Sequence, residues 1–545
     1  MLYVMPFLLA MIVTMAWLPV FGRAAAKWGI VDKPGVRKVH SIAIPRVGGL
    51  AMGLGVLVAA LIVIPLDANN RWFLIAAGVL AACGAADDRF DLDYRIKLAG
   101  QLVAILIVVL AGDAQIHSVT LDERLPLPQW ISIPLTVLFL VGITNAINLA
   151  DGLDGLAGGT TFLCLAALAM LAHGSGQPVT AALSLAFAGA ILGFLRFNTF
   201  PASVFMGDAG SQLLGFAVGV LSLRATQSSA TALSAATPIL LLALPILDTL
   251  SVMVQRVSEG RSPFSADKNH IHHKLLALGF DHHEAVMVIY AIQADLFLLA
   301  YWLRYESDLT ILGVVSIFFV VSIAFLQTAA RRGWRIRDRD EEKKDSALAR
   351  LLSILREPQF LPRWSYLAVV LGVGVYTLSI LAKTAKVTGD VQFLLVALLA
   401  VVSILLLILR AKPLNIIEKA ALYTTAAVLV YLDVVLPEQH ALAMLGWAAI
   451  GVAAAGTVLR LRLASDRRFV LTPLDLIVLF VALVVPSLPG SFALPDGGAA
   501  GIAKLVTLFY ALEVLLSRAD LGMVWLRIAA AAVLGGLVLR PWVPI

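Results

Sequence analysis

Long apolar runs constrain this chain more than any other feature. Runs of about 20 hydrophobic residues, separated by short charged loops, recur along the 545 residues, and a helix needs about that length to cross a bilayer. Hydrophobic residues make up 60% of the chain and charged residues 14%, whereas a soluble domain is about half apolar and about a quarter charged. The sequence therefore predicts an all-α, polytopic integral membrane protein that lies in a lipid bilayer.

The runs divide the chain into two membrane regions. Those before residue 330 predict a core of about 11 helices, and they cover residues 1–21, 47–66, 72–86, 97–112, 131–149, 159–173, 179–195, 211–223, 235–255, 285–303 and 309–329. About seven further runs follow residue 363. We predict a membrane domain over 1–330, a charged cytoplasmic linker over 331–363, and an additional multi-spanning region over 364–545 without an assigned function.

Lysine and arginine residues concentrate in alternate loops. In the first region these are loops 22–46, 87–96, 150–158, 196–210, 256–284 and 330–363. Because positive charge favours cytoplasmic loops, we expect these loops in the cytoplasm. In the second region the same rule places Arg460 to Arg468 and Arg518 inside and Lys383 outside. No positive segment precedes the first run, which favours a retained first helix over a cleaved signal peptide.

The segment Asn145–Gly159 carries two amides, two carboxylates and four glycines between two apolar runs. Its polar residues Asn145, Asn148, Asp151 and Asp154 recur every three positions, so on a continuous helix of about 3.6 residues per turn they could not all point one way. Two Asp-Gly pairs indicate a turn near Asp151. Because a carboxylate inside a bilayer is costly, we predict a helix end, an acidic loop at the water boundary and a new helix.

Two other acidic motifs lie at run boundaries on the same side. Asp87 and Asp88 are adjacent, and such carboxylates raise each other's pKa unless a cation or a proton lies between them. An ordinary acidic loop explains this pair equally well. The second motif, Gly207–Ser211, opens an apolar run. Its glycines allow close backbone approach, free amides at a helix start suit phosphate, and Asp208 offers an oxygen ligand for Mg²⁺.

Two basic segments complete the cytoplasmic side. His270, His272 and His273 lie in one short stretch, but zinc would need cysteine or carboxylate ligands at fixed spacings. We favour hydrogen bonding to phosphate or sugar, with a solvated loop as the alternative, and we expect the later His282 at the surface. The stretch 37–49 is either a membrane anchor or an attractant for an anionic substrate.

Together these motifs place carboxylates for a divalent cation, glycines for phosphates, and cations for further negative charge where the membrane meets the cytoplasm. This combination predicts phosphoryl transfer between a water-soluble donor and a lipid acceptor. A transporter or flippase of lipid-linked saccharides is the competing class, but transporters place ionisable groups near the bilayer midplane rather than at helix ends on one side.

The motifs also resemble a known family. They are Asp87-Asp88, Asn145-x-x-Asn148-x-x-Asp151-Gly152-x-Asp154-Gly155, Gly207-Asp208-x-Gly210-Ser211 and His270-Ile271-His272-His273. In this order, over about residues 1–330, they are similar to the polyprenyl-phosphate N-acetylhexosamine-1-phosphate transferases of the glycosyltransferase family 4 type. The histidine segment looks most like the branch that transfers GlcNAc-1-phosphate to undecaprenyl phosphate.

The resemblance implies transfer of a sugar-1-phosphate from a UDP-N-acetylhexosamine to a polyprenyl phosphate such as undecaprenyl phosphate, with release of UMP, to start a lipid-linked cell-envelope glycan. It implies Mg²⁺, with Mn²⁺ as the other candidate, held by Asp208 and Asn148. The implied catalytic residues are Asp87, Asp88, Asp151 and Asp154. The implied substrate-binding residues are Lys38, Arg46, Lys97, Asn145, His270, His272 and His273. Direct attack by the lipid phosphate and a covalent aspartyl intermediate both stay open.

The resemblance further implies a bacterial inner (plasma) membrane protein with a cytoplasmic active site. A second copy of the chain or a downstream glycosyltransferase is the candidate protein partner, and no nucleic acid is expected.

Overall fold

The structure is a computed structural model that describes residues 3–32, 43–121, 123–228, 231–262, 269–335, 360–383, 416–436, 440–463, 472–484, 498–516 and 519–539, with single positions between 392 and 403 and at 488. Within these residues the chain forms 19 helices and two pairs of short strands. Eight of the helices are long and apolar enough to cross a membrane. The predicted polytopic helical fold is therefore confirmed.

The described residues divide between two compact units, one built from most of residues 1–341 and the other from most of residues 342–545. Lys38 and most of the charged segment 331–363 lie outside the described residues, so the predicted linker stays a prediction.

The first unit follows the predicted apolar runs. Its helices are α1 (Val4–Trp28), α2 (Gly48–Val63), α3 (Ala68–Phe90), α4 (Tyr94–Leu110), α5 (Gln129–Ala150), α6 (Leu156–Gly174), α7 (Pro178–Asn198), α8 (Gly207–Gln227), α9 (Thr237–Leu241), α10 (Ala243–Ser258), α11 (Ile271–Ala277), α12 (His282–Trp302) and α13 (Asp308–Arg331). Two short antiparallel ladders pair β1 (Val31–Asp32) with β2 (Ile44–Pro45) and β3 (Ser118–Thr120) with β4 (Arg124–Pro126).

One predicted run, 235–255, breaks into α9 and α10 at Leu242. Pro245 has no amide hydrogen to donate back along the helix. The carbonyl of Leu241 instead accepts a hydrogen bond from Gln293 Nε2 of α12 at 2.9 Å. The carbonyl of Leu241 therefore has a hydrogen-bond partner although the helix is interrupted there.

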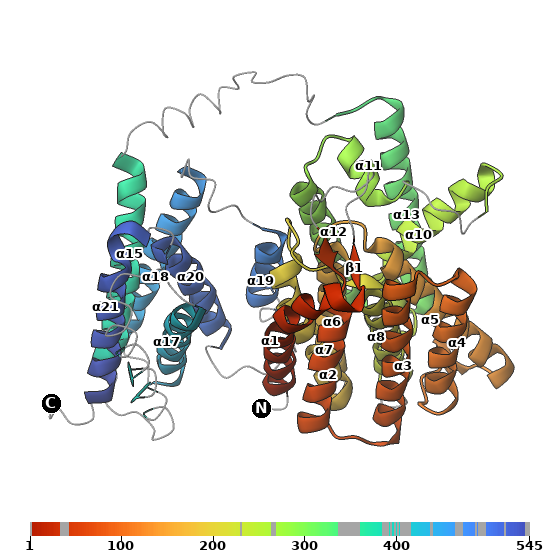
Figure 1. The fold of residues 1–545 in the computed structure, drawn as a ribbon, viewed down its shortest axis with the longest axis horizontal. Helices are drawn as coiled ribbons and strands as arrows, with labels where there is room; N and C mark the ends of the chain where they lie inside the picture. The colour runs from red at the N-terminus through yellow and green to blue at the C-terminus, as the bar shows by residue number, and fades with distance from the viewer. Residues whose placement is uncertain are drawn as a thin grey trace. The chain divides into compact units, whose positions relative to one another are not determined.

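Helices α6, α7 and α8 form the centre of this unit. Nearly every residue of α6 and α8 is buried, as expected for helices that are apolar all round. Helix α7 packs between α1 and α6, while α3 and α5 pack against α8 (Figure 1). The start of α8 is thus held among other helices rather than exposed to lipid.

Glycines set how closely the neighbours approach the start of α8. A Cβ atom on Gly84 of α3 would collide with the backbone of Ala209, and one on Gly49 of α2 would collide with the backbone of Gly210. The first amides of α2 also donate to the segment before α8, from Gly48 to the carbonyl of Phe205 at 3.0 Å. These contacts fix the position of α8 relative to α2 and α3.

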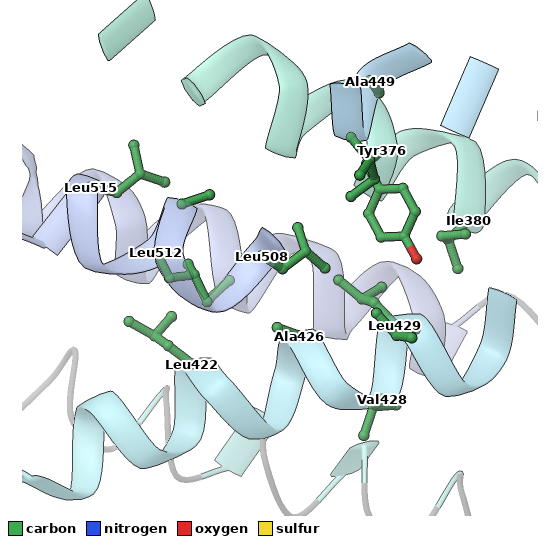
Figure 2. Packing of buried hydrophobic residues seen from close by; sticks show 14 of the residues in the cluster. Tyr376, Ile380, Leu422, Ala426, Val428, Leu429, Ala449, Leu508, Leu512 and Leu515 are labelled. Atoms are coloured by element: carbon green, nitrogen blue, oxygen red, sulfur yellow. The ribbon is translucent and has the colours of Figure 1, made fainter. Parts of the chain in front are cut away.

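The second unit is a separate helical bundle. Its helices are α15 (Phe360–Lys383), α17 (Ile416–Val435), α18 (His440–Leu463), α20 (Gly498–Leu516) and α21 (Ala519–Leu539), and the shorter α19 (Pro473–Leu483) has residues in both units. Figure 2 shows its core, in which Tyr376 of α15, Leu429 of α17 and Leu508 of α20 face one another. The described residues beyond 360 are therefore mainly helical and apolar, as predicted.

Candidate active site

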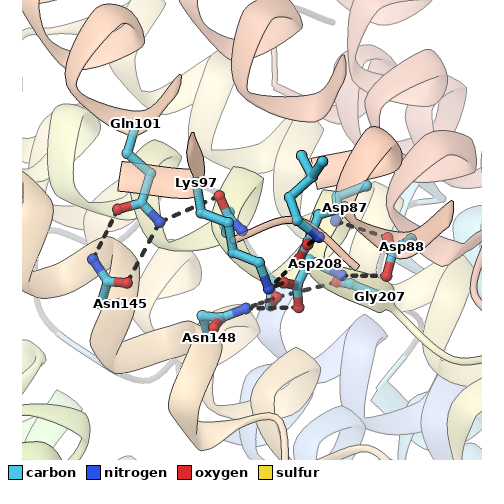
Figure 3. Close-up of polar contacts among 12 residues, drawn as sticks. Asp87, Asp88, Lys97, Gln101, Asn145, Asn148, Gly207 and Asp208 are labelled. Carbon is cyan, nitrogen blue, oxygen red and sulfur yellow. Dashed lines mark hydrogen bonds and ion pairs between the residues drawn. The ribbon is translucent and has the colours of Figure 1, made fainter. Parts of the chain in front are cut away.

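The acidic motifs come together at one end of the first unit. Asp87 and Asp88 lie in the last turn of α3, Lys97 in the first turn of α4, Asn148 in the last turn of α5, and Asp208 in the first turn of α8. Figure 3 shows these side chains pointing toward one another. Residues more than 100 positions apart in the sequence therefore share one polar cluster.

Lys97 bridges two carboxylates of this cluster. Its ammonium nitrogen lies 2.6 Å from Asp87 Oδ2 and 3.3 Å from Asp208 Oδ2. The second oxygen of Asp87 accepts the backbone N–H of Leu92 at 2.8 Å, which holds the end of α3. One ammonium thus lies between two negative groups, which is the arrangement that lets adjacent carboxylates stay ionised.

Asn148 contacts the other oxygen of the Asp208 carboxylate. Its Nδ2 donates to Asp208 Oδ1 at 3.2 Å and to Ser211 Oγ at 2.7 Å. Ser211 in turn donates to the carbonyl of Gly207 at 3.1 Å. The amide is therefore locked against α8, and it must rotate for its oxygen to become a metal ligand.

Asp88 has a different role from Asp87. Its two oxygens accept the backbone N–H groups of Asp208 at 2.9 Å and Ala209 at 3.1 Å. It therefore caps α8, whose first amides have no partner within the helix. Gly207 adopts a φ of 70°, and a Cβ there would collide with the Asp88 carboxylate, which explains the glycine. Because Asp88 occupies these two amides, they are not free to bind phosphate, contrary to expectation.

Asn145 lies one turn away and faces other partners. Its Nδ2 donates to Gln101 Oε1 at 2.9 Å, and Gln101 Nε2 lies 3.3 Å from Gln212 Oε1. These three amides join α5, α4 and α8, and Figure 3 shows the Gln101–Asn145 pair. The structure thus gives Asn145 a contact between helices, and its predicted substrate contact stays a prediction.

The loop between α5 and α6 contains the two remaining carboxylates. Burial raises the pKa of Asp151 to about 7, and the nearby charges of Asp208, Asp88 and Asp154 raise it further in the same direction. Asp154 instead braces the wall of the site, because its Oδ2 accepts the backbone N–H of Ala202 at 2.9 Å. Of these two, Asp151 is the one suited to exchange a proton near neutral pH.

The histidine segment reaches this loop from α11. His272 is buried and lies so close to Gly152 that a Cβ on that glycine would collide with its ring. Burial lowers the pKa of His272 to about 4, with the charge of His273 acting in the same direction. The His272 ring is therefore neutral at pH 7, so it offers hydrogen-bonding groups and no positive charge.

His270 is held by a carboxylate that sequence reasoning missed. Its Nδ1 lies 2.9 Å from Asp248 Oδ2, and Asp248 Oδ1 accepts the backbone N–H of Ile271 at 2.6 Å. Both side chains are buried. Asp248 therefore fixes the start of α11 and the orientation of the His270 ring. A lone carboxylate within the apolar run 235–255 was the available signal.

Three further contacts in the structure were not predicted from the sequence. Arg46 forms an ion pair with Asp32 across the β1–β2 ladder, a partner that no motif indicated. His282 was expected at the surface, but the structure half-buries it: its Nε2 accepts the backbone N–H of Asp154 at 3.1 Å and its ring stacks on Phe200. It therefore belongs to the wall of the site.

Comparison with known proteins identifies the family to which the chain belongs. The sequence profile described as glycosyl transferase family 4 matches residues 70–226. A probable undecaprenyl-phosphate N-acetylglucosaminyl 1-phosphate transferase of Bacillus subtilis (strain 168) is 42% identical over 53% of this chain and 81% of its own length. The chain belongs to glycosyl transferase family 4.

Two further relatives agree with this assignment. The decaprenyl-phosphate N-acetylglucosaminephosphotransferase of Mycolicibacterium smegmatis is 37% identical over 49% of this chain and 73% of its own length. The undecaprenyl-phosphate alpha-N-acetylglucosaminyl 1-phosphate transferase of Escherichia coli (strain K12) is 32% identical over 58% and 87%. This family 4 glycosyl transferase is therefore a multi-pass membrane enzyme that transfers a phospho-sugar to polyprenyl phosphate.

The donor set of this transferase fits a magnesium ion. Within the described residues no three His, Cys, Asp or Glu side chains are arranged to hold a metal by themselves. Mg²⁺ commonly takes one or two carboxylates and completes its shell with water and substrate phosphates. Asp208 supplies such a carboxylate, and the Lys97 ammonium beside it marks a place where positive charge is stabilised. Asp208 and a rotated Asn148 amide would hold the ion.

Proposed function

We propose that this transferase moves GlcNAc-1-phosphate from UDP-GlcNAc to undecaprenyl phosphate and releases UMP. It does so at a bacterial inner membrane, with its site facing the cytoplasm, and the product starts a lipid-linked cell-envelope glycan. The names of the relatives support the substrates. The observation that carries the proposal is the Asp87–Lys97–Asp208 cluster with Asn148 beside it at the start of α8.

The reaction forms one phosphorus–oxygen bond and breaks another. An oxygen of the lipid phosphate attacks the β-phosphorus of UDP-GlcNAc, and the bond from that phosphorus to the bridging oxygen breaks. UMP leaves with the bridging oxygen. A phosphate monoester is largely dianionic at pH 7, because its second pKa is about 6, so little proton removal is needed. Most of the rate enhancement must then come from positioning and electrostatic stabilisation.

The side chains divide this work. Lys97 offers positive charge to the phosphates, while Asp87 keeps the ammonium oriented. Asp151, with its pKa near 7, takes up the last proton of the lipid phosphate when one is present. The neutral ring of His272 and the Asp248-bound ring of His270 donate to phosphate or sugar oxygens. Mg²⁺, or Mn²⁺, bound by Asp208 and Asn148 would supply charge neutralisation on the diphosphate.

Asp88 and Asp154 are positioning residues in this scheme. Asp88 holds the first turn of α8, which carries Asp208, and Asp154 holds the loop that follows α7. Arg46, which bears an ion pair with Asp32, helps to attract the anionic substrates. Lys38 is proposed for the same task on its charge alone.

The decisive experiment measures UMP release by the purified full-length chain with UDP-GlcNAc, undecaprenyl phosphate and Mg²⁺. Asp208→Asn should abolish turnover while the protein stays folded. Asp113→Asn is the matched control, because Asp113 is exposed at a positive φ that asparagine also adopts. Wild-type turnover by Asp208→Asn would contradict the assignment. UMP released in stoichiometric amount without the lipid would contradict direct attack and favour the covalent route.

A further inference from the structure

The second unit contains a buried charged cluster that the transfer reaction does not use. Asp433 of α17 is flanked by two lysines, with Lys383 Nζ of α15 2.7 Å from its Oδ1 and Lys504 Nζ of α20 2.7 Å from its Oδ2. The three residues are only 7–8% exposed. We call Lys383, Asp433 and Lys504 the buried lysine cluster.

The charges of this cluster do not cancel. Two ammonium groups share one carboxylate, which leaves one positive charge in excess. An uncompensated charge in a low-dielectric interior costs several kcal/mol. Among the residues that the structure describes, the cluster therefore lacks one negative charge.

Its hydrogen bonds lead to the same conclusion. An ammonium has three N–H donors, yet within the described residues each lysine donates a single hydrogen bond, to Asp433. The hydroxyl of Tyr376, the ring shown in Figure 2, donates another to Asp433 Oδ2 at 3.2 Å. The carboxylate is therefore crowded with donors, and the groups that still need partners are the ammonium N–H groups. An additional acceptor would satisfy them.

The cluster lies near one end of the bundle. Lys383 is the last residue of α15, Asp433 is two residues before the end of α17, and Lys504 lies in the second turn of α20. At about 1.5 Å per residue this is within about 10 Å of the helix ends, the depth of lipid headgroups. Trp447, 46% exposed, lies over the Lys504 ammonium at 4.4 Å, and tryptophan favours the membrane interface.

Loop charges orient this end. The opposite end of α18 leads into Arg460 to Arg468, and that of α20 leads to Arg518. Because positive loops favour the cytoplasm, the buried lysine cluster lies toward the extracytoplasmic leaflet. The transfer reaction is proposed on the cytoplasmic side, so a separate ligand is needed to explain the cluster.

We propose that the buried lysine cluster binds the singly charged phosphodiester of an anionic membrane lipid in the extracytoplasmic leaflet. One negative charge balances the cluster to zero, and the phosphate oxygens accept the unused lysine N–H groups. A phosphate monoester, at about −1.5 to −2, would carry more charge than the cluster lacks.

The test uses the purified full-length protein and native mass spectrometry of retained lipid, with thermal stability as a second readout. The probes are phosphatidylglycerol, which is anionic, phosphatidylcholine, which is zwitterionic, and inorganic phosphate. Lys504→Gln and Lys383→Gln each leave one lysine paired with Asp433, a neutral pair that should fold. Lys27→Gln, at an exposed lysine of α1, is the matched control.

We expect the wild type and Lys27→Gln to retain phosphatidylglycerol about tenfold more tightly than phosphatidylcholine, the worth of one charge-assisted hydrogen bond. Both cluster variants should lose that preference while still releasing UMP at the wild-type rate. The proposal is overturned if the wild type does not prefer phosphatidylglycerol over phosphatidylcholine. It is also overturned if either cluster variant keeps that preference. Stabilisation by inorganic phosphate that displaces the lipid would assign the site to a soluble phosphate and overturn the lipid assignment.

Discussion

The carboxylate of Asp88 accepts the backbone N–H of Asp208, the proposed metal ligand, at 2.9 Å. Its neighbour Asp87 instead contacts Lys97. Two adjacent aspartates therefore do separate work. Asp87 faces the Lys97 ammonium, while Asp88 turns toward α8 and fixes its first turn. Adjacent residues on a helix point about 100° apart, which is what allows one pair to serve both tasks.

Replacing Asp88 should therefore damage activity through position. Asp88→Asn keeps one acceptor oxygen but offers an amide N–H to the other backbone donor, so one of the two capping hydrogen bonds is lost. The free energy of unfolding should fall by about 1 kcal/mol, the net worth of one hydrogen bond. A shift of Asp208 of about 1 Å should reduce kcat about a hundredfold. Thermal unfolding and UMP release measure the two effects. Asp91→Asn, at an exposed position one residue beyond α3, should change neither; normal turnover by Asp88→Asn would refute the positioning role.

A methyl group at Gly84 should displace the start of α8 and so disturb the site. Gly84→Ala places a Cβ against the backbone of Ala209, and such overpacking typically costs about 1–3 kcal/mol. Because the displaced backbone begins α8, turnover should fall as well. Gly78→Ala on the same helix meets nothing within 4 Å and should be neutral or slightly stabilising. Equal melting temperatures for the two variants would contradict the close α3–α8 packing.

Asp248 and His270 should behave as one unit. Asp248→Asn weakens the contact that orients the ring, so its loss of kcat/KM should approach that of His270→Gln. The double variant should then be little worse than either single one, with a coupling energy of about 1 kcal/mol or more. Michaelis–Menten kinetics on all four proteins measure this cycle. Strictly additive losses would show that Asp248 acts independently of His270.

The raised pKa of Asp151 should make the free energy of unfolding depend on pH. A carboxyl whose pKa is about 7 when folded, against 3.8 for an unperturbed aspartate, opposes folding once it must ionise. The cost starts above about pH 4, grows until about pH 7 and then stays constant. Without nucleotide or Mg²⁺, Asp151→Asn should therefore melt at the wild-type temperature near pH 4 and several degrees higher at about pH 8. A stabilisation that shrinks as pH rises would contradict the environment described for Asp151.

Sequence patterns were sufficient for most of the helices and for the members of the polar cluster, though not for Asp248 and His282. Apolar run length follows directly from bilayer thickness, so α2 to α8 begin and end within a few residues of the predicted runs, whereas α1 extends beyond the predicted residue 21 to Trp28. The break at Leu242 was not predicted, because hydropathy is continuous there and only the proline backbone interrupts the helix. The residues of the polar cluster were also predicted, because charged side chains at a membrane boundary are retained where they face water, an ion or a partner.

Individual contacts were beyond sequence reasoning. The sequence does not show that Asp87 contacts Lys97 while Asp88 caps α8, because those contacts depend on how α3 packs against α8. Asp248 and His270 are 22 positions apart and meet only when α10 and α11 fold together. Spacing along the chain reports which residues share a face, and tertiary packing decides which atoms meet.

The neutral amides of Gln101, Asn145 and Gln212 have one more consequence. They tie three helices together one turn from Asn148, and the other members of that polar cluster carry charge. Carboxamides neither titrate near neutral pH nor attract counterions, so acid or high salt that disturbs the reacting groups leaves this tie intact. The enzyme can therefore lose turnover under such conditions and regain it on return to neutral buffer, because the alignment of its helices has not been erased.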